Sequence, residues 1–249
     1  MIVFIKKSSV FLLCTIFICV MMIAGIALGS IGVPATVNAS YGKVVVIDAG
    51  HGEPDGGAAG ADGTTEAGLN LLVAQKLNNL LLQSDIKTVM TRTTNEGIYD
   101  PSAKNITEKK RTDMRKRREI QSSVGADLFI SIHMNQFEQS KYHGAQVVYD
   151  GKNAEAKRLA ECIQSALREG VDPDNDRQAM KSDGSIYLLK NAPVPSVIVE
   201  CGFLSNGEEL EKLKTDEYQT KLAWAVMKGI EAYYADTGGN GSAADSAPQ

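Results

Sequence analysis

The stretch from Val44 to Gly57, VVVIDAGHGEPDGG, decides which fold the chain is expected to adopt. Four apolar residues run into Asp48, and a glycine-rich turn then carries His51. A buried strand that ends in such a loop is typical of an open α/β sheet, which places its chemistry outside the carboxyl ends of its strands. The glycines let the loop backbone fold closely around a small group.

Downstream of this stretch, apolar strands alternate with segments of helical periodicity. This alternation predicts an α/β fold: a single domain with a central, mostly parallel sheet flanked by helices. A long polar loop is expected from Thr93 to Thr112, and Trp224 is expected on the buried face of the last helix. The further predicted strands span 86–92, 128–132, 144–149, 185–189 and 197–199, and the predicted helices span 64–84, 115–124, 154–169, 208–213 and 217–234.

The two ends of the chain differ in composition from this domain. Residues 1–29 hold two lysines followed by an uncharged run from Val10 to Leu28, which predicts either a secretory signal peptide or an N-terminal membrane anchor. The positive-inside rule then places the domain outside the cytoplasmic membrane, with possible membrane association through residues 9–29. Residues 30–42 are expected to be a linker, 43–235 the catalytic domain and 236–249 a flexible tail.

Composition supports one sizeable core and gives no reason to expect a nucleic-acid partner. Of the 249 residues, 43% are hydrophobic, and the formal net charge is −4. Basic residues gather locally in KKRTDMRKRR, from Lys109 to Arg118. The ordinary interpretation of such a run is a solvated helix face.

Polar side chains follow three of the predicted strands, at the point where each strand ends. His51, His133 and Glu200 hold these positions, and Glu66 lies at the start of the helix after the first strand. Because parallel strands end at the same edge of a sheet, the four side chains are expected to converge on one cleft. A charge directly after a buried strand is costly unless it is paired or functional, which favours a site here.

Two histidines and one carboxylate are the ligand set of a catalytic zinc ion that keeps its fourth position for water. Zinc lowers the pKa of that water to about 7 and polarises a substrate carbonyl. The remaining carboxylate would act as general base and acid. From the residues alone, either Glu66 or Glu200 can be the ligand and the other the base.

Three further residues are expected near this edge of the sheet. Arg92 either holds a substrate carboxylate or pairs with Asp48, and Asn135 either donates to a substrate carbonyl or caps a turn. Asp48 is expected to orient a ligand histidine from behind rather than to bind metal. His143 lies in a polar stretch and is expected at the surface.

Four motifs in order carry a resemblance to a known family. They are VVVIDAGHGEPDGGAAG, the downstream Glu66, ADLFISIHMN and VPSVIVECGFLSNGEE, and together they resemble the zinc-dependent N-acetylmuramoyl-L-alanine amidases of the bacterial cell wall. The resemblance implies that His51, Glu66 and His133 bind one zinc ion and that Glu200 is the catalytic carboxylate. It also implies hydrolysis of the amide between N-acetylmuramic acid and L-alanine in peptidoglycan.

The chain shows neither wall-binding repeats nor an inhibitory helix, and this plan is similar to that of the sporulation amidases. That similarity implies a role in muramic-δ-lactam formation in the spore cortex, upstream of a deacetylase. It places the enzyme outside the cytoplasmic membrane or in the forespore intermembrane space, and substrate targeting then calls for a possible activating protein partner. The alternatives are another zinc peptidoglycan peptidase and a non-catalytic wall-binding protein.

Overall fold

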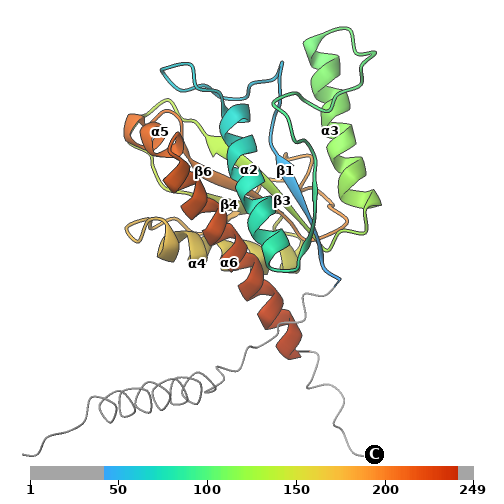
Figure 1. Ribbon diagram of the computed structural model, residues 1–249, viewed down its shortest axis with the longest axis vertical. Helices are drawn as coiled ribbons and strands as arrows, with labels where there is room; N and C mark the ends of the chain where they lie inside the picture. The colour runs from blue at the N-terminus through green and yellow to red at the C-terminus, as the bar shows by residue number, and fades with distance from the viewer. Residues whose placement is uncertain (1–41, 241–249) are drawn as a thin grey trace, which may run out of the picture. The chain divides into compact units, whose positions relative to one another are not determined.

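The computed structural model describes residues 42–240. The predicted N-terminal segment (1–29), nearly all of the predicted linker (30–42) and the tail beyond residue 240 lie outside the described residues. Figure 1 shows a central sheet with α2, α4 and α6 packed in front of it and α3 placed apart from them. The predicted α/β fold with a mostly parallel sheet is confirmed.

Six strands form one sheet in the order β2-β1-β3-β6-β4-β5. The first four run parallel to one another, β4 runs antiparallel to β6, and β5 pairs parallel with β4. The parallel strands therefore end together at one edge, which holds the predicted site. Their bounds are β1 Val44–Ala49, β2 Lys87–Met90, β3 Leu128–Asn135, β4 Gln146–Tyr149, β5 Met180–Lys181 and β6 Ser196–Phe203.

The helices cover the two faces of this sheet unequally. Buried side chains of α2, α4 and α6 build the main core on one face, while α3 packs over a smaller cluster on the other. The short helix α5 follows β6 directly. The helix bounds are α2 Glu66–Gln83, α3 Ile106–Ser123, α4 Ala154–Gly170, α5 Gly207–Leu213 and α6 Asp216–Asn240.

Helix α3 begins nine residues earlier than predicted, within the segment expected to be a polar loop. The side chain of Asn105 accepts a hydrogen bond from the backbone N–H of Glu108 at 2.9 Å. The carboxylate of Glu108 in turn accepts from the backbone N–H of Lys104 at 2.9 Å. Asn-x-x-Glu is a start signal for a helix, and here the high density of charge after it concealed the helical pattern.

The predicted strand at 185–189, SIYLL, is wrong, because the structure forms turns there. Two of its side chains, Leu188 and Leu189, are buried by lying across the sheet. Leu188 packs with Val46 and Phe129, and Leu189 packs with Val148 and Ile198. A short apolar run does not distinguish a strand from a segment that lies on a sheet.

The last helix differs from the prediction in two ways. Trp224 is 52% exposed rather than packed in the core. The helix also continues to Asn240, so residues 236–240 of the predicted tail are helical. Within residues 42–240, no helix combines the length and the apolar character that crossing a membrane requires.

Candidate metal centre

The two histidines meet because β1 and β3 are parallel neighbours. Ala49 at the end of β1 pairs with Ile132, and the next residue of β3 is His133. The turn after β1 brings His51 back over this position with a φ of 58°, a left-handed conformation that is unusual for a residue other than glycine. Gly50 passes so close to the His133 imidazole that a Cβ there would collide with it. The turn therefore needs glycine at position 50 to bring the two rings together.

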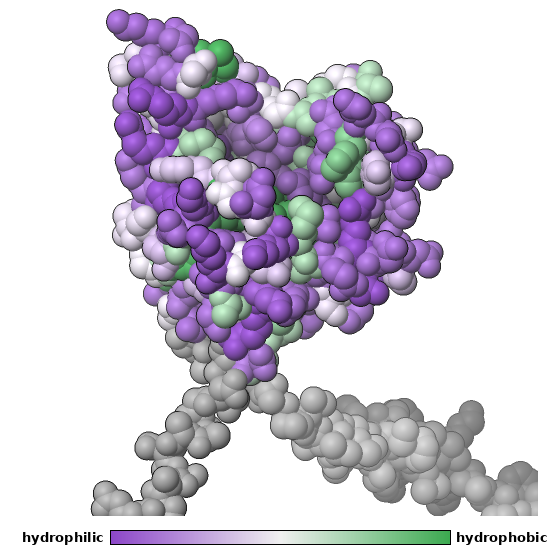
Figure 2. All heavy atoms as spheres, turned by 180° about the vertical axis from the view of Figure 1, so that it is seen from behind, coloured by the Kyte–Doolittle hydropathy of each residue, from purple (hydrophilic) through white to green (hydrophobic). Residues whose placement is uncertain are grey.

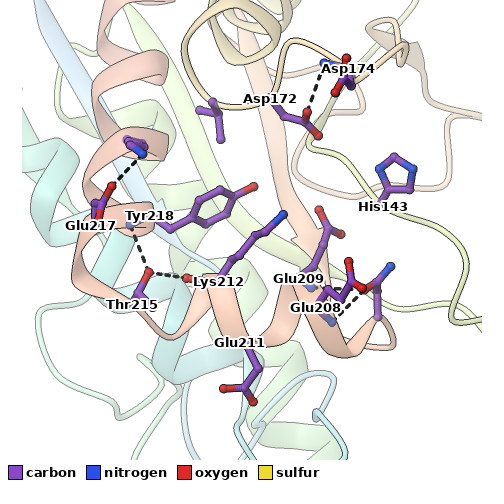
Figure 3. A pocket seen from close by; sticks show the side chains of 13 residues that line it. His143, Asp172, Asp174, Glu208, Glu209, Glu211, Lys212, Thr215, Glu217 and Tyr218 are labelled. Atoms are coloured by element: carbon purple, nitrogen blue, oxygen red, sulfur yellow. Dashed lines mark hydrogen bonds and ion pairs between the residues drawn. The ribbon is translucent and has the colours of Figure 1, made fainter.

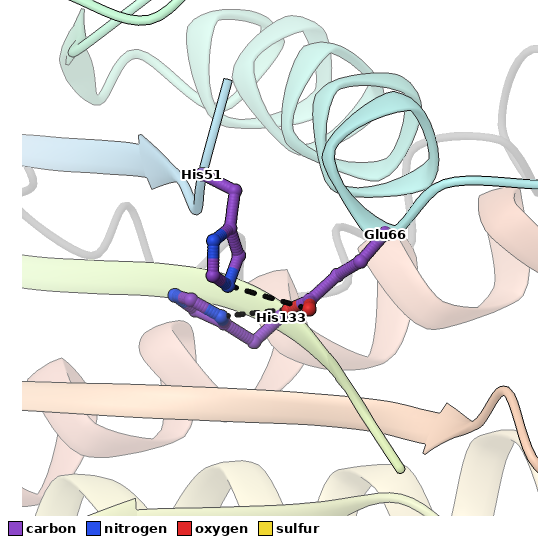
Figure 4. Close-up of side chains that lie close together, drawn as sticks. All are labelled: His51, Glu66 and His133. Carbon is purple, nitrogen blue, oxygen red and sulfur yellow. Dashed lines mark hydrogen bonds and ion pairs between the residues drawn. The ribbon is translucent and has the colours of Figure 1, made fainter. Parts of the chain in front are cut away.

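The Glu66 carboxylate contacts both rings from one side, as Figure 4 shows. Its Oε1 is 2.9 Å from His133 Nδ1, and its Oε2 is 3.3 Å from His51 Nε2. The two ring centroids are 5.1 Å apart. One donor atom from each of the three residues falls within 4.8 Å of the others, the arrangement expected around a single metal ion.

The electrostatics of this cluster favour a bound cation. Burial raises the pKa of Glu66, but the two histidines outweigh it and hold that pKa well below its usual range. Backbone N–H groups of Ala58 and Met134 also donate to the Glu66 carboxylate, at 2.9 and 3.1 Å. The chain thus keeps an ionised, almost fully buried carboxylate between two imidazoles, and a dication that replaced the imidazole protons would fit that donor set.

Glu200 lies beside this cluster on the adjacent strand. Its Cα is paired in register with that of His133, so both side chains point to the same face of the sheet. The Oε2 atom of Glu200 is buried and has no hydrogen-bond partner among residues 42–240. Burial raises the pKa of Glu200, as does the negative charge of Glu66, against the opposing effect of the histidines. A carboxyl group with a raised pKa beside a candidate metal centre is suited to proton transfer.

Asp55 contacts the ring nitrogen of His51 that faces away from Glu66, a role that the sequence pattern did not indicate. Asp55 Oδ2 lies 3.2 Å from His51 Nδ1, which leaves Nε2 facing Glu66. Lys110 on α3 holds the other carboxylate oxygen at 2.9 Å. Burial opposes the charge on His51, but Glu66 and Asp55 outweigh it and raise the His51 pKa. The available signal was the spacing of four residues between His51 and Asp55 inside the turn.

Asp48 does not have the predicted role of orienting a histidine. Among the described residues its hydrogen-bond partners are Thr91, Ser131 and Arg117, and neither histidine is one of them. Arg117, only 1% exposed, also donates to the carbonyl oxygen of His51. Asp48 therefore supports the turn indirectly, through a buried arginine that the sequence analysis assigned to a solvated helix face.

Arg92 and Asn135 contact the backbone rather than the cleft. The predicted pairing of Arg92 with Asp48 is wrong, because Arg117 takes that place. Arg92 instead donates to four carbonyl oxygens, those of Ala49, Gly50, Ala67 and Thr94, at 2.8 to 2.9 Å. The Asn135 side-chain oxygen accepts from the next backbone N–H at 2.8 Å, as a turn cap does.

A pocket of about 240 Å³ opens beside the two histidines. Figure 2 shows the edge where the parallel strands end, hollowed between two raised parts of the surface. Several residues of α3 line the pocket, and Ile186, Leu188 and Ile198 add apolar lining. Because the pocket contains His51 and His133 in its lining, it is the candidate substrate cleft.

A larger cavity, of about 730 Å³, lies between the end of α4, α5 and the start of α6. Acidic side chains dominate it, with Asp172, Asp174 and Glu208 around Lys212, as Figure 3 shows. His143 lies at its rim and is exposed, as predicted. No residue of the His51–Glu66–His133 cluster lines this cavity, so its size does not make it the candidate site.

Comparison with known proteins gives a consistent picture. The family model described as N-acetylmuramoyl-L-alanine amidase matches residues 45–232. The germination-specific N-acetylmuramoyl-L-alanine amidase of Bacillus subtilis is 36% identical over 197 residues, which cover 79% of this chain and 82% of that protein. The amidase LytC of the same organism is 33% identical over 199 residues, 79% of this chain and 36% of LytC.

A solved structure matches the fold over the same part of the chain. The CwlD amidase from Clostridioides difficile, solved in complex with the GerS lipoprotein, is 41% identical, with a TM-score of 0.76. The match covers 78% of this chain and 99% of that chain. Sequence and fold therefore point to the same group of proteins.

Proposed function

We propose, from the premise that this chain belongs to the N-acetylmuramoyl-L-alanine amidase family, that His51, Glu66 and His133 hold a zinc ion and that Glu200 is the general base and acid. As an amidase, the enzyme hydrolyses the amide between N-acetylmuramic acid and L-alanine. The observation that carries the proposal is the convergence of three ligand atoms within 4.8 Å of one another, beside a buried carboxylate.

The donor set fits zinc. It offers His51 Nε2, His133 Nδ1 and a Glu66 carboxylate oxygen, which is the two-histidine, one-carboxylate set of catalytic zinc sites. Bound there, zinc supplies a Lewis acid that polarises a carbonyl and acidifies water. Asp55 keeps the Nε2 atom of His51 available as a ligand by accepting a hydrogen bond from Nδ1.

Glu200 has the position and the pKa for proton transfer. It lies in register with His133, with one carboxylate oxygen buried and free of hydrogen bonds within the described part of the chain. Burial raises its pKa toward the working range of a general base. In this proposal Glu200 takes the proton of the attacking water and delivers it to the departing amine of L-alanine.

The similarity to the germination-specific amidase supports a role in the spore cortex. There, removal of the peptide from muramic acid precedes the deacetylation that leads to muramic-δ-lactam. The enzyme would act outside the cytoplasmic membrane. The neighbouring structure of an amidase bound to a lipoprotein supports an activating partner of that kind for this chain.

Product analysis tests the reaction. The zinc-loaded full chain, with and without a candidate lipoprotein, is incubated with purified cortex and vegetative wall, and soluble products are identified by mass spectrometry. Amidase action releases peptides that begin with L-alanine and leaves muramic acid without peptide. Products cut within the peptide would contradict the proposal.

Metal analysis tests the ligand set separately. His133→Ala should lose bound zinc, whereas His143→Ala, which changes a histidine away from the cluster, should keep it. Full zinc occupancy in His133→Ala would remove this residue from the ligand set.

A further inference from the structure

One face of α3 forms a wall of the candidate cleft, which Ile186 and Leu188 also line. The residues of α3 that line the pocket recur at the spacing of one helix face: Ile106, Lys109, Lys110, Asp113, Met114 and Arg117. This face is graded along the helix, from the exposed Ile106 at the rim to the fully buried Arg117 at the base. Lys109 and Lys110 lie on this face between Ile106 and Met114, so the pocket offers positive charge beside apolar side chains.

The two lysines at this rim differ in what they already bind. Lys110 is paired with Asp55, which in turn contacts His51. Lys109 is half-buried, and its Nζ lies 4.5 Å from the centre of the Tyr99 ring. Within residues 42–240, no carboxylate forms an ion pair with Lys109. Its ammonium group is therefore held at the rim by an aromatic face and remains available to an anion.

The charge of this wall contrasts with the rest of the protein. The whole chain has a net charge of −4, and acidic residues outnumber basic ones in the lining of the larger cavity near α5. Along α3, the basic Lys109, Lys110, Arg111, Arg115, Lys116, Arg117 and Arg118 stand against the acidic Glu108, Asp113 and Glu119. An acidic ligand is therefore drawn to the α3 side of the metal cluster and repelled from the α5 side.

The size of the pocket sets how much of a ligand it can take. Pockets that enclose a whole drug-sized molecule span about 300–1,000 Å³, so a pocket of about 240 Å³ accommodates one or two residues beside the reacting amide. Lys109 and Lys110 both line this pocket, but the ammonium of Lys110 is engaged by Asp55, which contacts His51. Lys109 is therefore the lysine of this face that is left for a charged group of a ligand.

We propose that Lys109 binds the carboxylate of the second residue of the stem peptide, while the first residue, L-alanine, lies against the apolar wall formed by Met114 and Ile186. This assignment rests on the proposed amidase function, and it makes the α3 wall the peptide side of the cleft. Lys109 is then a determinant of specificity for the charge of the stem peptide, and the glycan leaves the cleft on the side away from α3.

Two matched substrates test this assignment. They are N-acetylmuramoyl-L-alanyl-D-glutamic acid and its carboxamide analogue, which differ only in the charge of the second residue. With the zinc-loaded full chain, the acid should show a kcat/KM about 10-fold above that of the amide, the size expected for one hydrogen bond to a charged group. Lys109→Gln should remove this preference by lowering kcat/KM for the acid alone, and Lys109→Glu should reverse it.

Arg111→Gln is the matched control, because it removes one positive charge from the same helix at a residue that does not line the pocket. It should keep the preference. The assignment would be overturned if Lys109→Gln kept the wild-type preference for the acid. It would also be overturned if Arg111→Gln lost this preference as fully as Lys109→Gln does. Either result would leave the amidase function intact.

Equilibrium binding of the two product dipeptides, L-alanyl-D-glutamate and its carboxamide, separates this inference from the proposed function. Tighter binding of the acid that depends on Lys109 supports the inference, even if the enzyme shows no turnover. The proposed function is contradicted if there is no turnover with added zinc and with every partner tested. Equal binding of both dipeptides to the wild type would overturn the inference.

Discussion

The two faces of the central sheet bury different kinds of side chain, although the same strands supply both. Along β1, Val45, Ile47 and Ala49 face the main core, whereas Val46 and Asp48 face α3. On the α3 face, β1 and β3 are apolar at Val46 and Phe129 and polar toward their carboxyl ends, at Asp48 and Ser131. The strands therefore place their polar site residues at the carboxyl-end edge of this face, while the core face is packed with apolar side chains.

This difference has a physical cause. A parallel sheet covered on both faces favours apolar residues throughout, and a polar residue within it needs partners. On the α3 face, Asp48 is satisfied by two hydroxyl groups and Arg117, whereas one oxygen of Glu200 has no partner within the described part of the chain. The first arrangement holds the turn in place, and the second leaves a buried carboxylate oxygen unpaired beside the metal cluster.

The largest effect should come from Glu200→Gln, which keeps the shape of the side chain and removes its ability to carry a proton. General acid–base catalysis contributes about 10²–10⁴-fold, so we expect kcat to fall by about 10³-fold or more. Zinc content and the far-UV spectrum should match those of the wild type. A rate on peptidoglycan within a few-fold of wild type would show that another group moves the proton.

Replacing Arg117 with methionine should destabilise the α3 face strongly. The change leaves Asp48 buried without its cation, and breaking a buried ion pair by removing one partner costs about 3–5 kcal/mol. Urea unfolding at pH 7 measures this cost. The double variant Asp48→Asn/Arg117→Met removes both charges and should recover part of the loss; a double variant less stable than Arg117→Met would contradict the pairing.

The same pair predicts how stability depends on pH. Burial raises the Asp48 pKa, but Arg117, Ser131 and Thr91 outweigh it and lower that pKa below its usual value. The stabilisation is therefore present above the unfolded pKa of about 3.9 and is lost as pH falls through the lower folded value. Unfolding free energies measured from pH 6 to pH 2 should fall more steeply in the wild type than in the double variant.

On the core face, Ile163→Ala should lower stability without changing the chemistry. Ile163 on α4 is fully buried, and Gly229 of α6 packs against it so closely that a Cβ would collide with its backbone. Truncation of a buried isoleucine costs about 2–5 kcal/mol. Glu161→Ala on the exposed side of α4 is the control and should change stability by less than about 0.5 kcal/mol. An altered kcat in folded Ile163→Ala would show that the two faces are coupled.

How much of each face can be predicted from the sequence depends on how far apart in the chain the contacting residues lie. His51, His133 and Glu200 were found because each follows an apolar run, and such runs are local. Arg117 was missed because its burial depends on Asp48, 69 residues away, and nothing in a run of basic residues marks the one that points inward. Lys110 was missed for the same reason, because its partner Asp55 lies far from it in the chain.

The errors in secondary structure have related causes. The segment 185–189 has the apolar content of a strand, but Leu188 and Leu189 are buried by lying on the sheet. The carbonyl oxygens of Tyr187 and Leu188 accept hydrogen bonds from Arg118 and Gln121 of α3. The start of α3 was recoverable from Asn105 and Glu108. The Asn105–Glu108 capping pattern therefore predicts the start of this helix better than the charge of the residues that follow it.

The smallest effect concerns the stability of the metal-free protein, and it uses Glu200→Gln again. Because burial raises the Glu200 pKa, the ionised carboxylate destabilises the fold as pH rises above the unfolded value of about 4.3. With zinc removed by a chelator, Glu200→Gln should therefore be more stable than the wild type at pH 7, by on the order of 1 kcal/mol. The gain should vanish near pH 3.5, where the wild-type side chain is neutral in both states. A gain in stability that persisted at low pH would instead reflect better packing of the glutamine amide. The difference between the hydrogen-bonded Asp48 and the unpaired Glu200 would then not be electrostatic.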